Sequence, residues 1–376
     1  MRKFFRVLLP MCILLVLVGC TSFGEDELEE TEQYVEDEEQ EVLLSQFEEF
    51  QQDRETYAAV CAPFDIYDPL EKICYPPESC ETVDDCAALG DELAEEIYEW
   101  FGDLLTDYAF DGDGDTYDEQ VLARYQVEGN SLTNPQFVVV DEQLEPYRDA
   151  IEMHASIWET FRYLIPEKDR EMVSGFTIFT DGDEEMLAQV EPDAENVANW
   201  ILGVDVVDAE ESYILKTTLL HEYAHLLTLQ QSQMDMDEDI LFADAEDPIH
   251  QTSAAACSYF HVDGMGCTKE TSYLHQFYLQ FWEDLIEEWD ARDVAADEEE
   301  AEAFYEDYED QFVTDYAVTS PDEDIAEVWT YFILASRPDG DEIWEQKILF
   351  FYQYPEQVKL RAEVLSRLYS YLTLED

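Results

Sequence analysis

The sequence predicts an α+β fold that is mostly helical. Apolar residues recur at the helical period of about 3.6 residues over several long stretches, the clearest being 144–164, 210–230 and 320–336. Short runs rich in β-branched and aromatic residues indicate the strands of a small sheet: 137–140, 173–180, 186–190 and 198–206. With 376 residues, 46 % of them hydrophobic, the chain can bury a full core as one large domain preceded by a smaller one.

The N-terminus is typical of an exported protein. Three basic residues precede an apolar stretch from Val7 to Val18, so we interpret residues 1–19 as a signal peptide that is too short to span a membrane. Leu17-Val18-Gly19-Cys20 resembles a bacterial lipobox, which implies cleavage before Cys20 and lipid modification of that cysteine. We therefore expect an extracytoplasmic protein anchored to a bacterial membrane. An ordinary signal peptide followed by an incidental cysteine is the alternative.

Acidic residues dominate the chain. There are 93 acidic and 18 basic residues, and the formal net charge is −75, which excludes nucleic acid as a partner. We interpret the acidic residues as a solvated surface suited to a salty extracellular medium, in preference to a dedicated cation-binding surface. Residues 20–45 are especially acidic, and repulsion between like charges predicts an extended tether there.

The cysteines also indicate export. Apart from Cys12 and Cys20 the chain has six, an even number that suggests disulfides. Cys257 and Cys267 are near neighbours and are expected to pair. The other four, all between positions 61 and 86, predict a stapled, loop-rich part of a helical segment over 46–118, and three pairings are open: Cys61, Cys74, Cys80 and Cys86. A zinc site is a weaker interpretation, because they form no C-x-x-C pair.

Apolar spacing predicts one helix over about 42–60, which crosses the start of the 46–118 segment, and another over 87–109 within it. Asp111, Asp113 and Asp115 then offer carboxylates at alternate positions, a pattern that suits calcium. The EF-hand pattern is not met, since Thr116 and Leu122 stand where it has glycine and glutamate. An Asp/Gly turn without a bound ion is the alternative.

From about residue 119 to 376 we expect a single larger domain. His154 is expected to pack within the helix 144–164 rather than to bind a metal, and the strand-like runs lead into a buried helix at 210–230. The segment 231–270 has no regular pattern. The remaining helical stretches are 273–289, 294–312, 320–336 and 355–372, and Ser320 and Glu323 have the spacing of a capping box at the start of the third.

The buried helix contains His221-Glu222-Tyr223-Ala224-His225, an H-E-x-x-H motif. Residues four apart lie on one face of a helix, so His221 and His225 can offer two imidazoles to one zinc ion. Glu222 lies beside the first ligand, where its carboxylate can take a proton from a metal-bound water. The alternative is a helix with two hydrogen-bonded core histidines.

A catalytic zinc site needs a third protein ligand. Glu323 is the preferred ligand, and Glu327, four residues further on the same helix face, would support a ligand imidazole from outside the metal's own shell. Asp244, His250 and His261 are alternatives for the third ligand.

The segments HEYAH (221–225) and EDIAE (323–327) together resemble the gluzincin zinc metallopeptidases, in particular the branch with anthrax lethal factor and the bacterial Pro-Pro endopeptidases. The resemblance implies a zincin-like domain with a small sheet and an active-site helix. Tyr316, seven residues before Glu323, matches a tyrosine that would stabilise the oxyanion. Glu323 follows His225 by 98 positions, a longer interval than is usual in this branch, which leaves room for an insertion at 250–310.

These features predict a membrane-anchored, extracytoplasmic zinc endopeptidase with a peptide or protein substrate, which we expect to be a monomer. One alternative is a non-catalytic acidic surface lipoprotein that binds cations or a protein partner. Another is a zinc hydrolase that acts on a different bond. Glu222 favours catalysis, because a purely structural zinc site has no use for a general base.

Overall fold

The computed structural model describes residues 33–35, 37–58, 66–68, 73–75, 79–101, 116–182, 186–210, 212–243 and 247–375. In this part of the chain the fold is α+β and mostly helical, with one small mixed sheet, as the sequence predicts. The signal peptide and several candidate site residues lie outside the described residues: Cys20, Asp111, Asp113, Asp115 and Asp244.

The main sheet has five strands in the order β4-β3-β5-β7-β6. They are β3 (Thr116–Glu128), β4 (Ser131–Phe137), β5 (Val173–Gly182), β6 (Ala188–Asp193) and β7 (Asn196–Asp205). β4 and β6 form the two edges of this order. β5 and β7 are parallel, and the other neighbouring strands are antiparallel. The strands predicted at 173–180, 186–190 and 198–206 are confirmed within a few residues.

The hairpin of β3 and β4 is a feature that the sequence did not predict. A strand was expected at 137–140, but β4 ends at Phe137, and Val138 forms only an isolated bridge with Tyr34. The apolar run 137–140 led to that prediction, whereas the strand itself contains Asn134 and Pro135, which break the alternation of apolar and polar residues. Within the hairpin, Gly129 supplies the positive φ of 62° that the tight turn requires.

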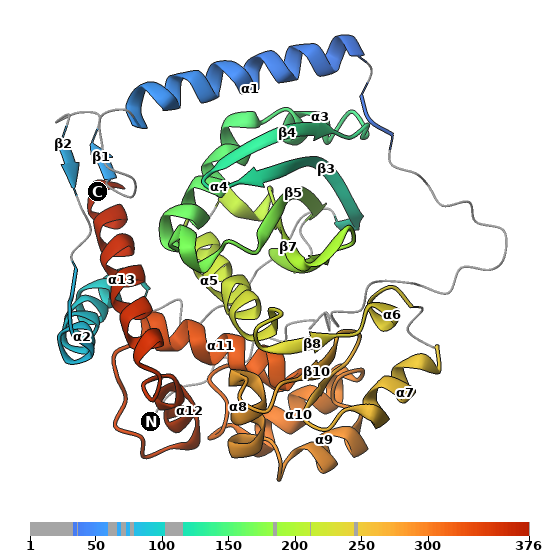
Figure 1. Cartoon of the computed structure of the whole chain (residues 1–376), viewed down its shortest axis with the longest axis vertical. Helices are drawn as coiled ribbons and strands as arrows, with labels where there is room; N and C mark the ends of the chain where they lie inside the picture. The colour runs from blue at the N-terminus through green and yellow to red at the C-terminus, as the bar shows by residue number, and fades with distance from the viewer. Residues whose placement is uncertain are drawn as a thin grey trace.

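Helices α3 (Glu145–Arg148) and α4 (Ile151–Leu164) replace the single helix expected at 144–164, and α4 packs against the sheet. Helix α5 (Ser212–Leu229) follows β7 and lies between the sheet and the C-terminal helices (Figure 1), and its residues are mostly buried. Leu219, Leu220, Ala224 and Leu226 have no solvent exposure at all. The prediction of a buried helix at this position is therefore confirmed.

The C-terminal half packs below the sheet in Figure 1 and is largely helical. It contains α8 (Tyr273–Phe281), α9 (Ile286–Arg292), α10 (Glu298–Tyr308), α11 (Pro321–Leu334), α12 (Ile343–Phe351) and α13 (Pro355–Glu375). The helix expected at 273–289 is two helices. Helix α12 was not predicted, because a stretch that is apolar on most sides carries little helical period.

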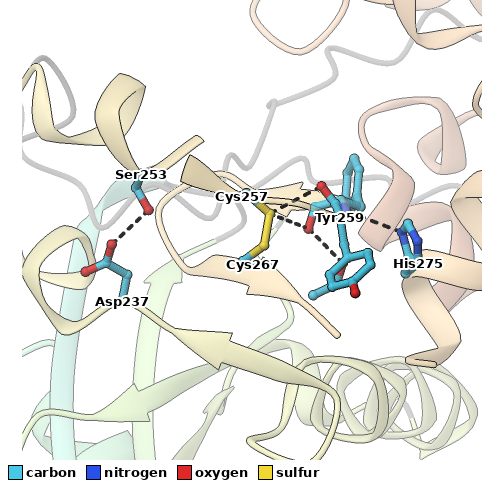
Figure 2. The surroundings of a disulfide bond; sticks show 8 residues. Asp237, Ser253, Cys257, Tyr259, Cys267 and His275 are labelled. Atoms are coloured by element: carbon cyan, nitrogen blue, oxygen red, sulfur yellow. Dashed lines mark hydrogen bonds between the residues drawn. A yellow bond between two sulfur atoms is a disulfide. The ribbon is translucent and has the colours of Figure 1, made fainter. Parts of the chain in front are cut away.

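The segment 231–270, expected to be irregular, has short elements of its own. These are β8 (Met234–Met236), α6 (Glu238–Leu241), α7 (Ile249–Ala256), β9 (His261–Val262) and β10 (Gly266–Thr268). The three strands form a small antiparallel sheet in the order β8-β10-β9. The expected disulfide between Cys257 and Cys267 closes the loop in front of it (Figure 2).

A second disulfide joins Cys80 to Cys86 at the start of α2 (Val83–Phe101), and β1 (Ile66–Asp68) pairs with β2 (Ile73–Tyr75) nearby in the chain. Cys86 is buried against Val358 and Ala362, so apolar packing holds the start of α2 against α13. Two disulfides are consistent with an oxidising environment. Among the described helices, none has the length and apolar character needed to cross a membrane.

The structure corrects the tether prediction for residues 33–35 and 37–45. Helix α1 runs from Asp37 to Ala58, and Val35 donates its backbone N–H to Phe137 at the edge of β4, at 3.0 Å. Leu43 and Phe47 are buried in the core. Burial of these apolar side chains outweighs the repulsion between the surrounding acidic residues.

His154 lies in the core beneath β3, as predicted for a packing residue. Its Nδ1 lies 2.8 Å from the hydroxyl of Tyr125, and its Nε2 lies 2.7 Å from the carbonyl oxygen of Tyr147. Burial lowers the pKa of His154 to about 4, so the folded protein keeps this imidazole neutral.

A pH dependence of stability follows from His154. The unfolded state binds a proton at His154 below about pH 6.5, whereas the folded state binds it only near pH 4, so stability is lost as the pH falls between these values. We expect the free energy of unfolding to fall by about 2 kcal/mol between pH 7 and pH 5 because of this residue. Urea titrations of the wild type and His154→Gln measure it. Equal pH dependence in the two proteins would contradict the assignment.

Helices α11 and α12 are joined by a fully buried ion pair. Lys347 Nζ lies 2.5 Å from Asp324 Oδ2, both side chains have no exposure, and Trp282 Nε1 donates to the same oxygen at 2.7 Å. The ring of Phe312 lies under the ammonium group, with its centroid 3.9 Å from Nζ. One oxygen of the Asp324 carboxylate therefore accepts from both Lys347 and Trp282, while Phe312 covers the ammonium group.

Lys347→Met should destabilise the protein by about 3–5 kcal/mol, because it leaves the carboxylate of Asp324 buried without its counter-charge. The matched control is Lys359→Met, at an exposed position of α13. Thermal and urea unfolding of both variants test this expectation, and equal stability of the two variants would show that the pair contributes little.

Candidate metal centre

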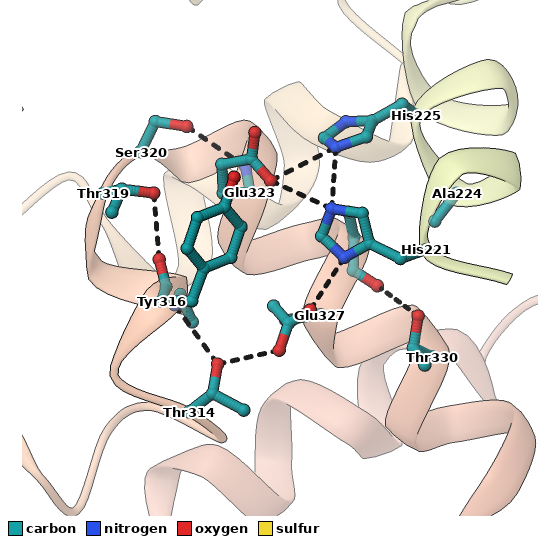
Figure 3. Close-up of polar contacts among 12 residues, drawn as sticks. His221, Ala224, His225, Thr314, Tyr316, Thr319, Ser320, Glu323, Glu327 and Thr330 are labelled. Atoms are coloured by element: carbon teal, nitrogen blue, oxygen red, sulfur yellow. Dashed lines mark hydrogen bonds and ion pairs between the residues drawn. The ribbon is translucent and has the colours of Figure 1, made fainter. Parts of the chain in front are cut away.

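The candidate metal centre lies where α5 and α11 pack against each other (Figure 3). Helix α5 presents His221 and His225 from successive turns, and α11 presents Glu323 from its first turn. The start of α11 is fixed by Ser320, whose hydroxyl accepts the backbone N–H of Glu323 at 3.1 Å. Local capping therefore places the carboxylate that faces the two imidazoles.

The three side chains converge on one point. Glu323 Oε2 lies 3.0 Å from His221 Nε2 and 3.2 Å from His225 Nε2, and the two Nε2 atoms are 3.0 Å apart. Donors bonded to a tetrahedral ion at about 2.0–2.1 Å stand roughly 3.3 Å from one another. Within the described part of the chain, these three residues form a group that could hold a metal ion.

The electrostatics of the centre favour a positive charge among these donors. Burial acts to lower the pKa of His221, but hydrogen bonds with Glu323 and Glu327 raise it well above its ordinary value. Burial acts to raise the pKa of Glu323, yet the charge of His225 and the hydrogen bonds of both imidazoles hold it well below its usual range. A bound cation would satisfy the same demand.

Glu327 lies outside this triangle and supports it. Its Oε1 lies 2.7 Å from Nδ1 of His221, so the imidazole donates its Nδ1 proton to the carboxylate and keeps Nε2 free for a metal. The other oxygen, Oε2, accepts a hydrogen bond from the hydroxyl of Thr314 at 2.8 Å. Thr314 was not predicted, since a threonine thirteen residues before Glu327 leaves no signal in the sequence.

Glu222 and Tyr316 border the same site. Burial raises the pKa of Glu222, although His225 and His221 act in the opposite direction. Tyr316 belongs to the 3-10 turn Tyr316–Val318, and its ring centroid lies 6.0 Å from that of His221. Burial, together with the charges of Glu323 and Glu222, raises the pKa of Tyr316 well above its ordinary value, so its hydroxyl stays protonated.

The alternative histidine ligands lie elsewhere. His261 is on β9, and the titratable groups that act on it are Asp263, His250 and Asp237, not the residues of the α5–α11 centre. The hydroxyl of Ser253 donates to Asp237 at 2.8 Å, to the left of the Cys257–Cys267 disulfide in Figure 2. In the described residues, neither histidine joins the group around His221.

A second acidic group, not predicted as a site, consists of Asp181, Asp205 and Asp208 at the ends of β5 and β7. Asp205 is fully buried and accepts backbone N–H groups of Asp181 and Val207 at 2.9 and 2.7 Å. Burial raises the pKa of Asp205 despite these bonds. This group could not be predicted from the sequence, because its members come together through the parallel pairing of β5 and β7.

Glu323→Gln should weaken binding of zinc by more than the roughly 10- to 100-fold that loss of an outer partner costs, because it replaces a charged ligand by a neutral amide. The matched control is Glu142→Gln, at an exposed position remote in sequence. Chelator-competition titrations of the purified full-length proteins measure the affinity. Unchanged affinity in Glu323→Gln would remove this residue from the metal centre.

Comparisons with protein-family models, with curated proteins and with solved structures give no match for this chain. The function is therefore proposed from the residues of the site and their geometry. The donor set of two imidazoles and one carboxylate, with a buried glutamate beside it, is the feature on which that proposal rests.

Proposed function

We propose that this protein is a zinc-dependent endopeptidase of the gluzincin type that acts outside the cytoplasm and is held at a bacterial membrane through lipid on Cys20. The observation that carries the proposal is the group of His221, His225 and Glu323, which supplies three donors in the described part of the chain. A structural zinc site has four protein ligands, whereas a catalytic one has three and keeps a position open.

Zinc is the proposed ion because imidazole nitrogen and carboxylate oxygen suit it and the donor spacing agrees with its bond lengths. When bound, zinc would polarise a carbonyl oxygen and lower the pKa of a water molecule. Glu327 supports this role of the site, since its bond to His221 Nδ1 orients the imidazole and makes it a better donor.

Glu222 is the proposed general base. Its carboxylate takes a proton from the water that attacks the scissile carbonyl, and it returns that proton to the departing amine as the C–N bond breaks. A pKa raised by burial suits this work, because the group must both accept and release a proton near neutral pH. Tyr316 keeps its hydroxyl proton and is proposed to donate a hydrogen bond to the oxyanion.

The surroundings support a peptide substrate. Strand β6 is an edge of the main sheet and contacts α5, the helix that carries His221 and His225. An extended peptide can add to such an edge through main-chain hydrogen bonds. A small sheet followed by a buried helix with the H-E-x-x-H motif is also the order of elements expected in a zincin-like domain.

Glu222→Gln tests the proposal. The variant should retain zinc but lose peptide hydrolysis by about 10²- to 10⁴-fold, the range that a positioned acid–base group contributes. A peptide library incubated with the zinc-loaded full-length chain gives the rate, and metal analysis gives the zinc content. A chelator should abolish hydrolysis by the wild type.

The control for this experiment is Glu299→Gln, at an exposed position of α10. It should hydrolyse peptides like the wild type. Undiminished cleavage by Glu222→Gln would reject the mechanism. Absence of any cleavage by the zinc-loaded wild type would favour the alternative, a non-catalytic acidic lipoprotein that binds cations or a protein partner.

A further inference from the structure

The hydroxyl of Thr314 has two partners that fix its direction. It accepts the backbone N–H of Ala317 at 3.2 Å and donates to Glu327 Oε2 at 2.8 Å (Figure 3). A backbone N–H can only donate, so the hydroxyl must use a lone pair there and direct its single proton to the carboxylate. A hydrogen bond to a charged acceptor of this kind is stronger than one between neutral groups.

The two partners of Thr314 belong to different parts of the site, one to the metal ligands and the other to the turn of Tyr316. Through Glu327, whose other oxygen lies 2.7 Å from His221 Nδ1, the hydroxyl reaches a metal ligand on α5. Through Ala317 it reaches the 3-10 turn Tyr316–Val318. Thr319 closes the same turn by donating its hydroxyl to the carbonyl oxygen of Tyr316 at 2.9 Å.

We propose that Thr314 is a positioning residue that fixes the turn of Tyr316 relative to the Glu327–His221 pair. A threonine often bonds the backbone within its own turn, and the bond from Ala317 is of that local kind. The bond to Glu327 serves no turn, because the two residues are thirteen positions apart and lie on different elements. It limits rotation of the carboxylate and therefore of the imidazole that the carboxylate holds.

Thr314 acts on two parts of the site that can be measured separately. The effect on His221 concerns only the metal centre and its affinity. The effect on Tyr316 rests on the proposed function, in which the phenol meets the oxyanion. An experiment that measures metal affinity and turnover separately distinguishes the two.

Three full-length variants test the proposal. Thr314→Val keeps the side-chain shape but removes the hydroxyl, Thr314→Ser keeps the hydroxyl, and Thr330→Val makes the same change as the first at a matched position. Thr330 lies on α11, where its hydroxyl donates only to the carbonyl oxygen of Ala326 in its own helix, at 3.0 Å. Zinc affinity is measured by chelator competition, and kcat and KM by peptide hydrolysis.

We expect Thr314→Val to weaken zinc affinity about tenfold, the lower end of the range for loss of a partner outside the metal's ligands. Its kcat should fall further than its affinity, with KM little changed. Thr314→Ser should restore both quantities to within about twofold of the wild type, and Thr330→Val should match the wild type.

Wild-type zinc affinity in folded Thr314→Val would overturn the proposal, and so would failure of the serine variant to restore what valine removes. An equal loss of affinity in Thr330→Val would also overturn it, because removal of a hydroxyl that bonds only within its own helix would then have the same effect. If the wild type binds zinc but hydrolyses no peptide, the proposed function fails, whereas the affinities of the three variants still decide the role of Thr314.

Discussion

The packing of α5 against α11 is the constraint on which the rest of the site depends. Both helices are buried, and at their contact they bring together polar groups that would be costly to bury alone. The cost is offset because each group faces a partner of opposite character. Glu323 lies in the first turn of α11, where the helix dipole also favours a negative charge. Away from the polar groups, the rings of Tyr223 and Trp329 pack against each other with their centroids 5.2 Å apart, and this contact joins the same two helices.

Neighbouring carboxylates of α11 have separate tasks. Glu323 and Glu327 face α5, whereas Asp324, about 100° further round the helix than Glu323, meets Lys347 and Trp282 in the core. The helix is therefore fixed in two directions, and its carboxylates are carried by a rigid element rather than by a loop. Such support keeps side chains within the small displacements that a catalytic arrangement tolerates.

Much of this arrangement was predictable because it is local. The H-E-x-x-H motif and the apolar positions around it define the α5 helix, and Ser320 signals the start of α11. The link between the helices spans 98 positions, and it was indicated by the shared helix face of Glu323 and Glu327 together with the resemblance to the gluzincins. Thr314 and the aspartates at 181, 205 and 208 were missed, since their neighbours are set by tertiary packing. The hairpin of β3 and β4 was missed because polar residues obscure its alternation, and the tether prediction overvalued charge relative to the apolar side chains of α1.

The attachment of Gln33 and Val35 to β4 has a consequence for where this protein works. Val139 donates its backbone N–H to the carbonyl oxygen of Gln33, and Val35 donates to that of Phe137, so residue 33 is fixed to the body of the fold. With lipid on Cys20, only thirteen residue steps connect the bilayer to that point, a reach of at most about 45 Å when fully stretched. The domain would then be confined to a thin layer of the cell envelope beside the bilayer. Proteins embedded in or bound to the same leaflet would encounter it far more often than freely diffusing ones.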